Sequence, residues 1–222
     1  MRPWVRLPTQ WMKANGLIKF WWGKEGVGSD NVAALMELIA ISHAVDDYGI
    51  ARITYTDLGD ITGLSRAKMA AGLNILRRNE LINTNSHGKS QYELVNFGKP
   101  GWGKLPVRSM YSGGRIAAFD DFNLRKIAEL DALKIYLLFV AFRGEDINAA
   151  RIGYEKIAEY SGVHGNRIKS AISLLTNNDL IVLDQRKKEN DPGYVFTYRI
   201  VGIDPRRHLG TTGREDIQAE AT

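Results

Sequence analysis

Two segments of the sequence gather basic, amide and hydroxyl side chains at spacings that place them on one face of a helix. These residues are Ser65, Arg66, Lys68 and Asn74 in the first segment and His164, Asn166, Arg167, Lys169 and Ser170 in the second. Arginine and lysine donate hydrogen bonds to guanine O6 and N7 or to phosphate, asparagine pairs with adenine, and serine bonds to either kind of group. The chemistry open to these side chains is therefore recognition of a polyanion that carries nucleobases.

A further group of basic residues lies in two polar, turn-rich stretches that follow those segments. Its members are His87 and Lys89 in one stretch and Arg186, Lys187 and Lys188 in the other. Each stretch separates two runs of alternating apolar residues, a pattern that predicts the tip of a β-hairpin. Basic side chains at such a tip can contact phosphate or the minor groove.

An internal repeat indicates which elements must hold these residues. Residues 52–82 and 151–181 align without a gap at an offset of 99, and eight of the 31 aligned positions are identical. Gly63 and Gly162 match, and each predicts a left-handed residue that ends a short helix. Ser65 is a good N-cap for a second helix, whose apolar residues recur at spacings of four and three and form a buried stripe. Each repeat therefore predicts two short helices joined by a tight glycine turn.

The residues around each repeat complete a larger unit. An apolar helix is predicted before each repeat, over 32–44 and 132–142, and a pair of strands after it. The order helix, helix, turn, helix, hairpin resembles the winged-helix domain. Its repetition is similar to tandem winged-helix DNA-binding proteins, among them the replication initiators of plasmids and phages and winged-helix transcriptional regulators. The resemblance implies an α+β fold, mainly α, with two winged helix-turn-helix domains in tandem.

The resemblance also implies a function. It is that of a sequence-specific double-stranded-DNA-binding protein without catalytic activity, a replication initiator that can also regulate its own promoter. One alternative is a transcriptional repressor that binds an operator through the same unit, and another is a protein-binding tandem winged-helix subunit of a chromosome-segregation type complex. The basic second helices and the acid-free stretch between the repeats favour a DNA partner over a protein partner.

The chain divides into five predicted segments. They are an aromatic and basic N-terminal arm over 1–30, a first winged-helix domain over 31–97, a basic glycine-rich linker over 98–119, a second winged-helix domain over 120–203 and a flexible C-terminal tail over 204–222. The arm holds four of the five tryptophans, interleaved with basic residues. We favour packing of these aromatics onto the first domain or onto a second subunit over contact with a nucleic-acid backbone. The arm or the first domain would then supply a homodimer contact.

The stretch between the repeats has no acidic residue from 95 to 119 and is rich in glycine. This composition predicts irregular chain that lets the two domains be positioned independently, and its charge suits a phosphate backbone as well as it suits an ordinary exposed linker. Gly98, Gly103 and Lys104 match the spacing of a nucleotide-binding loop. Leu105 stands where that loop needs a serine or threonine, so no nucleotide is expected.

Composition excludes several other classes of protein. The net charge of +5 favours a polyanionic partner, and the absence of cysteine excludes thiolate metal sites and fits a reducing cytoplasm. The four histidines are scattered and no hydrolase or nucleotide fingerprint is present, so neither a metal, a cofactor nor enzymatic activity is expected. No apolar run has the length of a signal peptide or a membrane span, which predicts a cytoplasmic protein.

Overall fold

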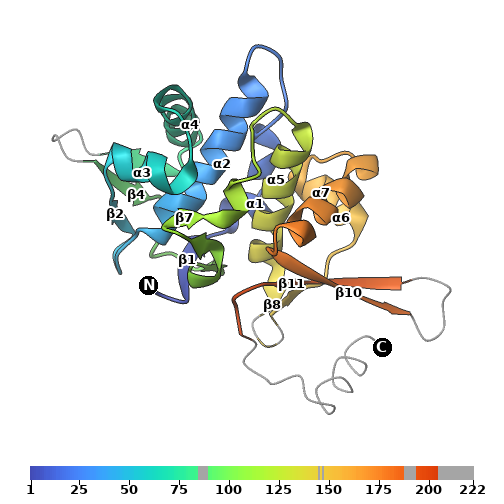
Figure 1. The fold of residues 1–222 in the computed structure, drawn as a ribbon. Helices are drawn as coiled ribbons and strands as arrows, with labels where there is room; N and C mark the ends of the chain where they lie inside the picture. The colour runs from blue at the N-terminus through green and yellow to red at the C-terminus, as the bar shows by residue number, and fades with distance from the viewer. Residues whose placement is uncertain (85–89, 145, 147, 188–193, 205–222) are drawn as a thin grey trace.

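Two helices that are apolar on nearly every side lie at the centre of the fold (Figure 1). They are α2 (Val27–His43) and α5 (Ile127–Phe142), and they contact each other. A helix that is apolar all round must be covered on every side, and residues 31–42 and 129–141 are indeed buried. The computed structural model describes residues 1–84, 90–144, 146, 148–187 and 194–204, and over these residues the fold is α+β and mainly helical.

The elements that follow the two central helices correspond in order, except that the second half has one additional short strand, β8 (Arg143–Gly144). The first half continues with β2 (Ile50–Arg52), α3 (Tyr55–Thr62), α4 (Arg66–Arg78), β3 (Ile82–Thr84) and β4 (Gln91–Leu94). The second half continues with β8 (Arg143–Gly144), β9 (Ala149–Ala150), α6 (Tyr154–Ser161), α7 (Gly165–Asn177), β10 (Ile181–Lys187) and β11 (Tyr194–Ile200). Strand order is β2-β4-β3 in one sheet and β9-β11-β10, with β8 outside β9, in the other, and every pair is antiparallel. The predicted repeat of helices and hairpins is confirmed at the level of elements.

The tight turn between the two short helices is the same in both halves. Gly63 and Gly162 have φ of 71° and 67°, the left-handed conformation that the sequence predicts. The residue before each glycine, Thr62 or Ser161, is buried and donates its hydroxyl to the carbonyl four residues earlier. That hydroxyl also accepts the amide two residues later, at 3.3 Å in the first half and 3.1 Å in the second. These bonds fix the angle between the two helices.

Polar side chains cap both α3 and α4, and the cap of α4 is the predicted Ser65. Thr54 accepts the amide of Asp57 at 3.0 Å, and the Asp57 carboxylate accepts the Thr54 amide in return. Ser65 accepts the amide of Lys68 at 3.4 Å. The predicted apolar stripe of α4 is buried, and its residues are Met69, Leu73 and Leu76.

The structure differs from the prediction for the linker over 98–119. Within it, β5 (Trp102–Pro106) pairs antiparallel along its whole length with β1 (Trp4–Pro8) from the N-terminal arm, so the prediction of irregular chain is wrong there. Leu105 is fully buried, and β5 contacts α5. Because this ribbon and the α2–α5 contact join the two halves, they are not positioned independently of each other.

The rest of the predicted linker and arm also packs onto both halves. In the arm, α1 (Gln10–Lys13) contacts α5, and the 3-10 turn η1 (Gly16–Lys19) contacts α6. The arm therefore covers the second half as well as the first. After β5 come η2 (Arg108–Met110), β6 (Tyr111–Ser112), β7 (Arg115–Ile116) and η3 (Ala117–Phe119). Of the predicted C-terminal tail, only residue 204 lies within the described residues.

Candidate nucleic-acid interface

The two helices that hold the predicted recognition residues lie on opposite flanks of the central pair. We call α4 and α7 the third helices, because each is the third helix of its half. α4 packs on α2 and α7 packs on α5, so α2 and α5 separate the third helices (Figure 1). Each third helix buries its apolar stripe and leaves the opposite face to solvent. That exposed face is what a major groove could receive.

The exposed face of α4 is basic. Arg66 is exposed, and its backbone carbonyl accepts the Tyr55 hydroxyl at 2.8 Å, which ties α4 to α3. Asn74 is exposed and its Oδ1 accepts from Arg77 at 2.8 Å. Ser65 is exposed but its hydroxyl oxygen is already used as the helix cap.

Lys68 has a different environment from Arg66. Its ammonium lies 2.6 Å from the Asp30 carboxylate and also donates to the Ser29 hydroxyl, both near the start of α2. The Lys68 side chain is 33% exposed, so solvent still screens this pair. Lys68 therefore holds α4 against α2, and its charge is largely neutralised by the Asp30 carboxylate.

The second half uses the matching position in the same way. Arg167 corresponds to Lys68 at the repeat offset, and its Nε lies 2.9 Å from Asp131 Oδ2 on α5. Burial raises the pKa of Asp131, and the charges of Arg167 and Lys134 oppose that rise. Burial lowers the pKa of Lys134 to about 8, and its ammonium donates to the Phe20 carbonyl at 2.8 Å. This charge cluster, in which Asp131 and Lys134 are buried and Arg167 is partly exposed, joins α5, α7 and the N-terminal arm.

The other predicted residues of α7 are exposed. His164 precedes the helix in the N-cap position, where its side chain makes no cap bond, and its Nδ1 lies 2.8 Å from the Asn166 Oδ1. Lys169 and Ser170 lie one turn further along the exposed side. His164, Asn166, Lys169 and Ser170 thus form one polar surface at the start of α7.

The predicted hairpin-tip residues fall mostly beyond what the structure describes. His87, Lys89 and Lys188 lie outside the described residues. Arg186 and Lys187 lie on β10, opposite Val195 and Tyr194 of β11.

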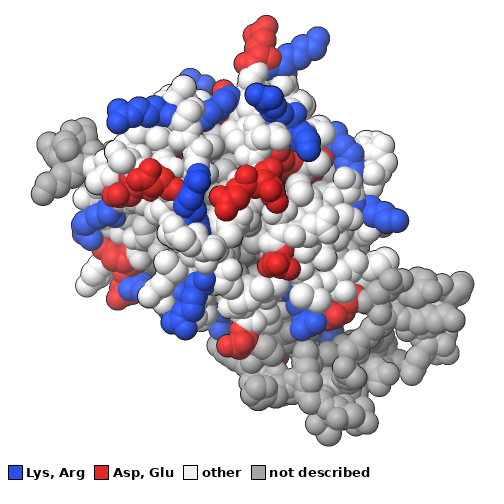
Figure 2. Space-filling model, viewed as in Figure 1, with Lys and Arg blue, Asp and Glu red and all other residues white. Residues whose placement is uncertain are grey.

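Two exposed arginines of α4 were missed by the sequence prediction. Arg77 and Arg78 lie in its last turn, and α4 holds no acidic residue between positions 66 and 78. A count of charges along the helix would have found them. α4 carries four Lys or Arg and α7 carries two. On the face shown in Figure 2, basic and acidic side chains are interspersed and carboxylates gather near the middle, so this face does not present a field of one sign.

A buried carboxyl lies beneath α4. Glu37 of α2 is fully buried, and neither of its carboxyl oxygens has a hydrogen-bond partner among the described residues. Burial raises the pKa of Glu37 to about 9, with Arg77 opposing the rise, so the group is neutral at neutral pH. Gly72 of α4 makes room for it, because a Cβ at Gly72 would contact the Glu37 carboxyl and lie 2.9 Å from the Ala34 backbone nitrogen.

Comparisons with protein families and with curated proteins gave no match that bears on this geometry. A search against protein-family models finds no match, and a search of curated proteins finds no relative. None of the helices in the described part of the chain combines the length and apolar character that crossing a bilayer requires. Among the described residues, no three histidine or acidic side chains come together as metal ligands.

Proposed function

We propose that the protein binds double-stranded DNA sequence-specifically, with α4 and α7 as the recognition helices of two winged-helix units. The observation that carries this proposal is the pair of exposed, acid-free third helices at matching places in two halves of the same topology. A helix about 10–12 Å across fits a major groove about 12 Å wide. A polar and cationic helix face without carboxylates is what phosphate and base edges require.

Particular residues would make the contacts. Arg66 and Asn74 of α4 and Asn166 and Lys169 of α7 are exposed and carry the donors that recognise guanine, adenine or phosphate. Alanines on α4 and Gly165 at the start of α7 let the backbone come close to the groove. Lys68 and Arg167 would act indirectly, by holding each third helix against its central helix.

The joined halves define how two helices would meet one DNA molecule. Because α2, α5 and the β1–β5 ribbon fix the separation of α4 and α7, the two units cannot search independently along the duplex. Linked sites gain affinity only where the geometry permits both contacts at once. The proposal therefore favours target sites with one defined spacing, or a bent duplex that reaches both flanks.

The proposed biological role is supported by the sequence resemblance alone. We propose a replication initiator of a plasmid or phage that also regulates its own promoter, with a repressor at an operator as the second candidate. Both roles would use the same exposed helix faces. A protein-binding subunit of a chromosome-segregation type complex would instead use these faces for a protein partner, and the cationic character of α4 speaks against that alternative.

One experiment tests the function and separates its candidates. Duplexes bound by the full chain are selected from a random pool and sequenced, and binding is then measured by fluorescence anisotropy at about 50 and about 200 mM salt. Several directly repeated copies of one motif support an initiator, whereas one inverted repeat supports an operator. Absence of duplex binding at low salt would overturn the proposal.

Matched variants locate the binding surface. The double variant Arg66→Ala, Lys169→Ala should lose affinity for the selected duplex. Arg125→Ala removes an exposed arginine just before α5, outside the sequence of both third helices, and should bind as the unaltered protein does. Equal loss in both variants would assign the binding to general charge instead of to α4 and α7.

A further inference from the structure

The β1–β5 ribbon presents tryptophans and cations alternately on one face. Side chains alternate between the two faces of a strand, so Trp4 and Arg6 of β1 lie on the same side as Trp102 and Lys104 of β5. Arg6 stands directly opposite Lys104 in the register. The other face points into the core, and its residues Val5, Leu7 and Leu105 are buried.

These four side chains form one continuous platform. The Trp4 and Trp102 rings are nearly parallel, at an interplanar angle of 7° and a centroid distance of 6.1 Å. The Arg6 guanidinium lies 4.8 Å from the centre of the Trp102 ring, and the Lys104 ammonium lies 4.7 Å from the Trp4 ring. Both rings keep part of their surface in solvent, and Arg6 is exposed. The platform thus offers flat aromatic surface and positive charge together.

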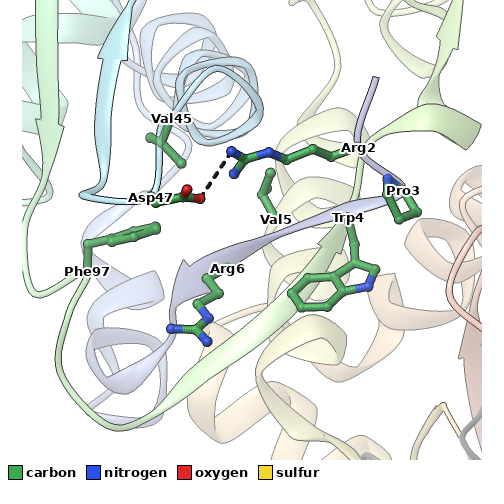
Figure 3. A pocket seen from close by; sticks show the side chains of 8 residues that line it. All are labelled: Arg2, Pro3, Trp4, Val5, Arg6, Val45, Asp47 and Phe97. Carbon is green, nitrogen blue, oxygen red and sulfur yellow. Dashed lines mark ion pairs between the residues drawn. The ribbon is translucent and has the colours of Figure 1, made fainter.

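An open pocket adjoins the platform (Figure 3). It has a volume of about 440 Å³ and is lined by Arg2, Pro3, Trp4, Val5, Arg6, Val45, Asp47 and Phe97. In Figure 3, Phe97 lies on the side of the pocket away from Trp4, so an aromatic ring lines the pocket on each of these sides. Its single carboxylate, on Asp47, is paired with Arg2 at 3.1 Å. The remaining charge of the pocket is positive.

The sequence around both strands extends this charge. Residues 1–24 contain five Lys or Arg and no acidic residue, and residues 95–119 contain four and none. The pairing of β1 with β5 brings these two acid-free segments together, which neither segment reveals alone. Such a surface is complementary to a polyanion.

We propose that the β1–β5 platform and its pocket bind single-stranded nucleic acid. Bases would stack on Trp4 and Trp102, and phosphates would lie against Arg6 and Arg2. Stacking on aromatic side chains needs the open face of a base, which a single strand offers and an intact duplex hides. The site is formed outside both third helices, so the proposal is independent of duplex recognition by α4 and α7.

Binding of a labelled thymidine oligonucleotide of about 20 residues tests the proposal, by anisotropy and by quenching of tryptophan fluorescence at about 50 mM salt. A uridine oligonucleotide of the same length distinguishes DNA from RNA as the natural strand. Trp102→Ala should weaken binding of the preferred oligonucleotide at least about fivefold. Arg6→Gln, which keeps both tryptophans, should weaken it and reduce its salt dependence. Neither variant should change affinity for the selected duplex.

The control is Trp21→Ala, because Trp21 is 57% exposed and lies outside the ribbon. It should bind the oligonucleotide as the unaltered protein does. The proposal is overturned if the unaltered protein binds neither oligonucleotide, if Trp21→Ala loses as much affinity as Trp102→Ala, or if duplex and single-strand affinity fall together in Arg6→Gln. Circular dichroism of each variant checks that the fold is kept, and Arg6→Gln decides the matter should Trp102→Ala unfold.

Discussion

The Arg167 guanidinium lies 2.9 Å from the Asp131 carboxylate, whose side chain is only 3% exposed. Lys68, the matching residue of the first half, lies 2.6 Å from Asp30. The two cations correspond at the repeat offset, but their acidic partners do not, because Asp30 aligns with Glu129. Each half thus reaches the same attachment of third helix to central helix through a different carboxylate.

Replacing Arg167 should affect stability more than DNA binding. Arg167→Ala removes the ion-pair partner of the buried Asp131 carboxylate and leaves only the more distant influence of the Lys134 charge, which should cost about 1–3 kcal/mol of unfolding free energy, moderated by the partial exposure of Arg167. Urea denaturation at neutral pH measures this loss. Lys169→Ala, which changes an exposed residue two positions further along α7, should keep the stability of the protein and lose duplex affinity. The opposite pattern would make Arg167 the DNA contact.

Arg66 should contribute to duplex affinity where Lys68 does not. If the Arg66 side chain contacts a base, Arg66→Ala should cost about 1–3 kcal/mol of binding free energy and relax sequence specificity. If it contacts phosphate, the slope of log affinity against log salt concentration should become shallower by about one. Lys68→Ala should leave the affinity of the folded protein nearly unchanged, because its ammonium is held by Asp30 and Ser29. Anisotropy titrations over a range of salt concentration compare the two. A larger loss for Lys68→Ala contradicts the assignment.

Glu37 should make stability depend on pH. Its pKa is about 9 in the folded protein against a usual 4.5, so the folded state keeps a proton that the unfolded state releases. Stability from this group is therefore complete below about pH 4.5 and is lost as pH rises towards 9. Glu37→Gln removes the loss and should be more stable than the unaltered protein by on the order of 3 kcal/mol at pH 7, with little difference at pH 4.

Denaturation midpoints across this pH range provide the measurement for Glu37→Gln. Glu93→Gln, on the exposed side of β4, is the matched control and should show no such trend. A flat difference between Glu37→Gln and the unaltered protein from pH 4 to 8 would argue that the carboxyl is hydrated or paired.

Gly72→Ala should destabilise a helix that alanine would ordinarily stabilise. In a free helix the change gains about 1 kcal/mol. Here the new methyl group would lie 2.9 Å from the Ala34 backbone nitrogen and against Glu37, so overpacking should cost about 1–3 kcal/mol. Gly165→Ala is the comparison, because no atom lies within 4 Å of its added Cβ, and it should be neutral or stabilising. Thermal melts of both variants report the sign.

Local signals in the sequence were enough to predict the third helices and their turns. Gly63 and Gly162 end helices because a glycine has no side chain to oppose the left-handed backbone. Ser65 caps the start of α4 through a hydrogen bond to an amide only three residues later. The apolar periodicity then fixed which side of α4 is buried. These features depend on residues within one turn of each other, so the sequence displays them directly.

Contacts between distant segments were beyond such signals. The glycine content of 98–119 predicted irregular chain, yet Gly103 is a glycine because a Cβ there would lie 2.5 Å from the Val140 carbonyl oxygen on α5. A glycine in the sequence can indicate either a flexible backbone or a close contact with another element, and the sequence alone does not distinguish the two. The ion pairs of Lys68 and Arg167 were equally hidden, because their partners lie on other helices. The tryptophan platform required knowing that β1 and β5 pair.

The contact between α2 and α5 has a consequence for how the molecule is assembled. Separating the halves by a cut ahead of β5 would part this strand from β1 and expose two helices that are apolar around their circumference. Neither fragment should then be stable on its own in water. The intact protein should unfold in a single cooperative transition. We therefore expect the two repeats to fold and unfold together as one unit.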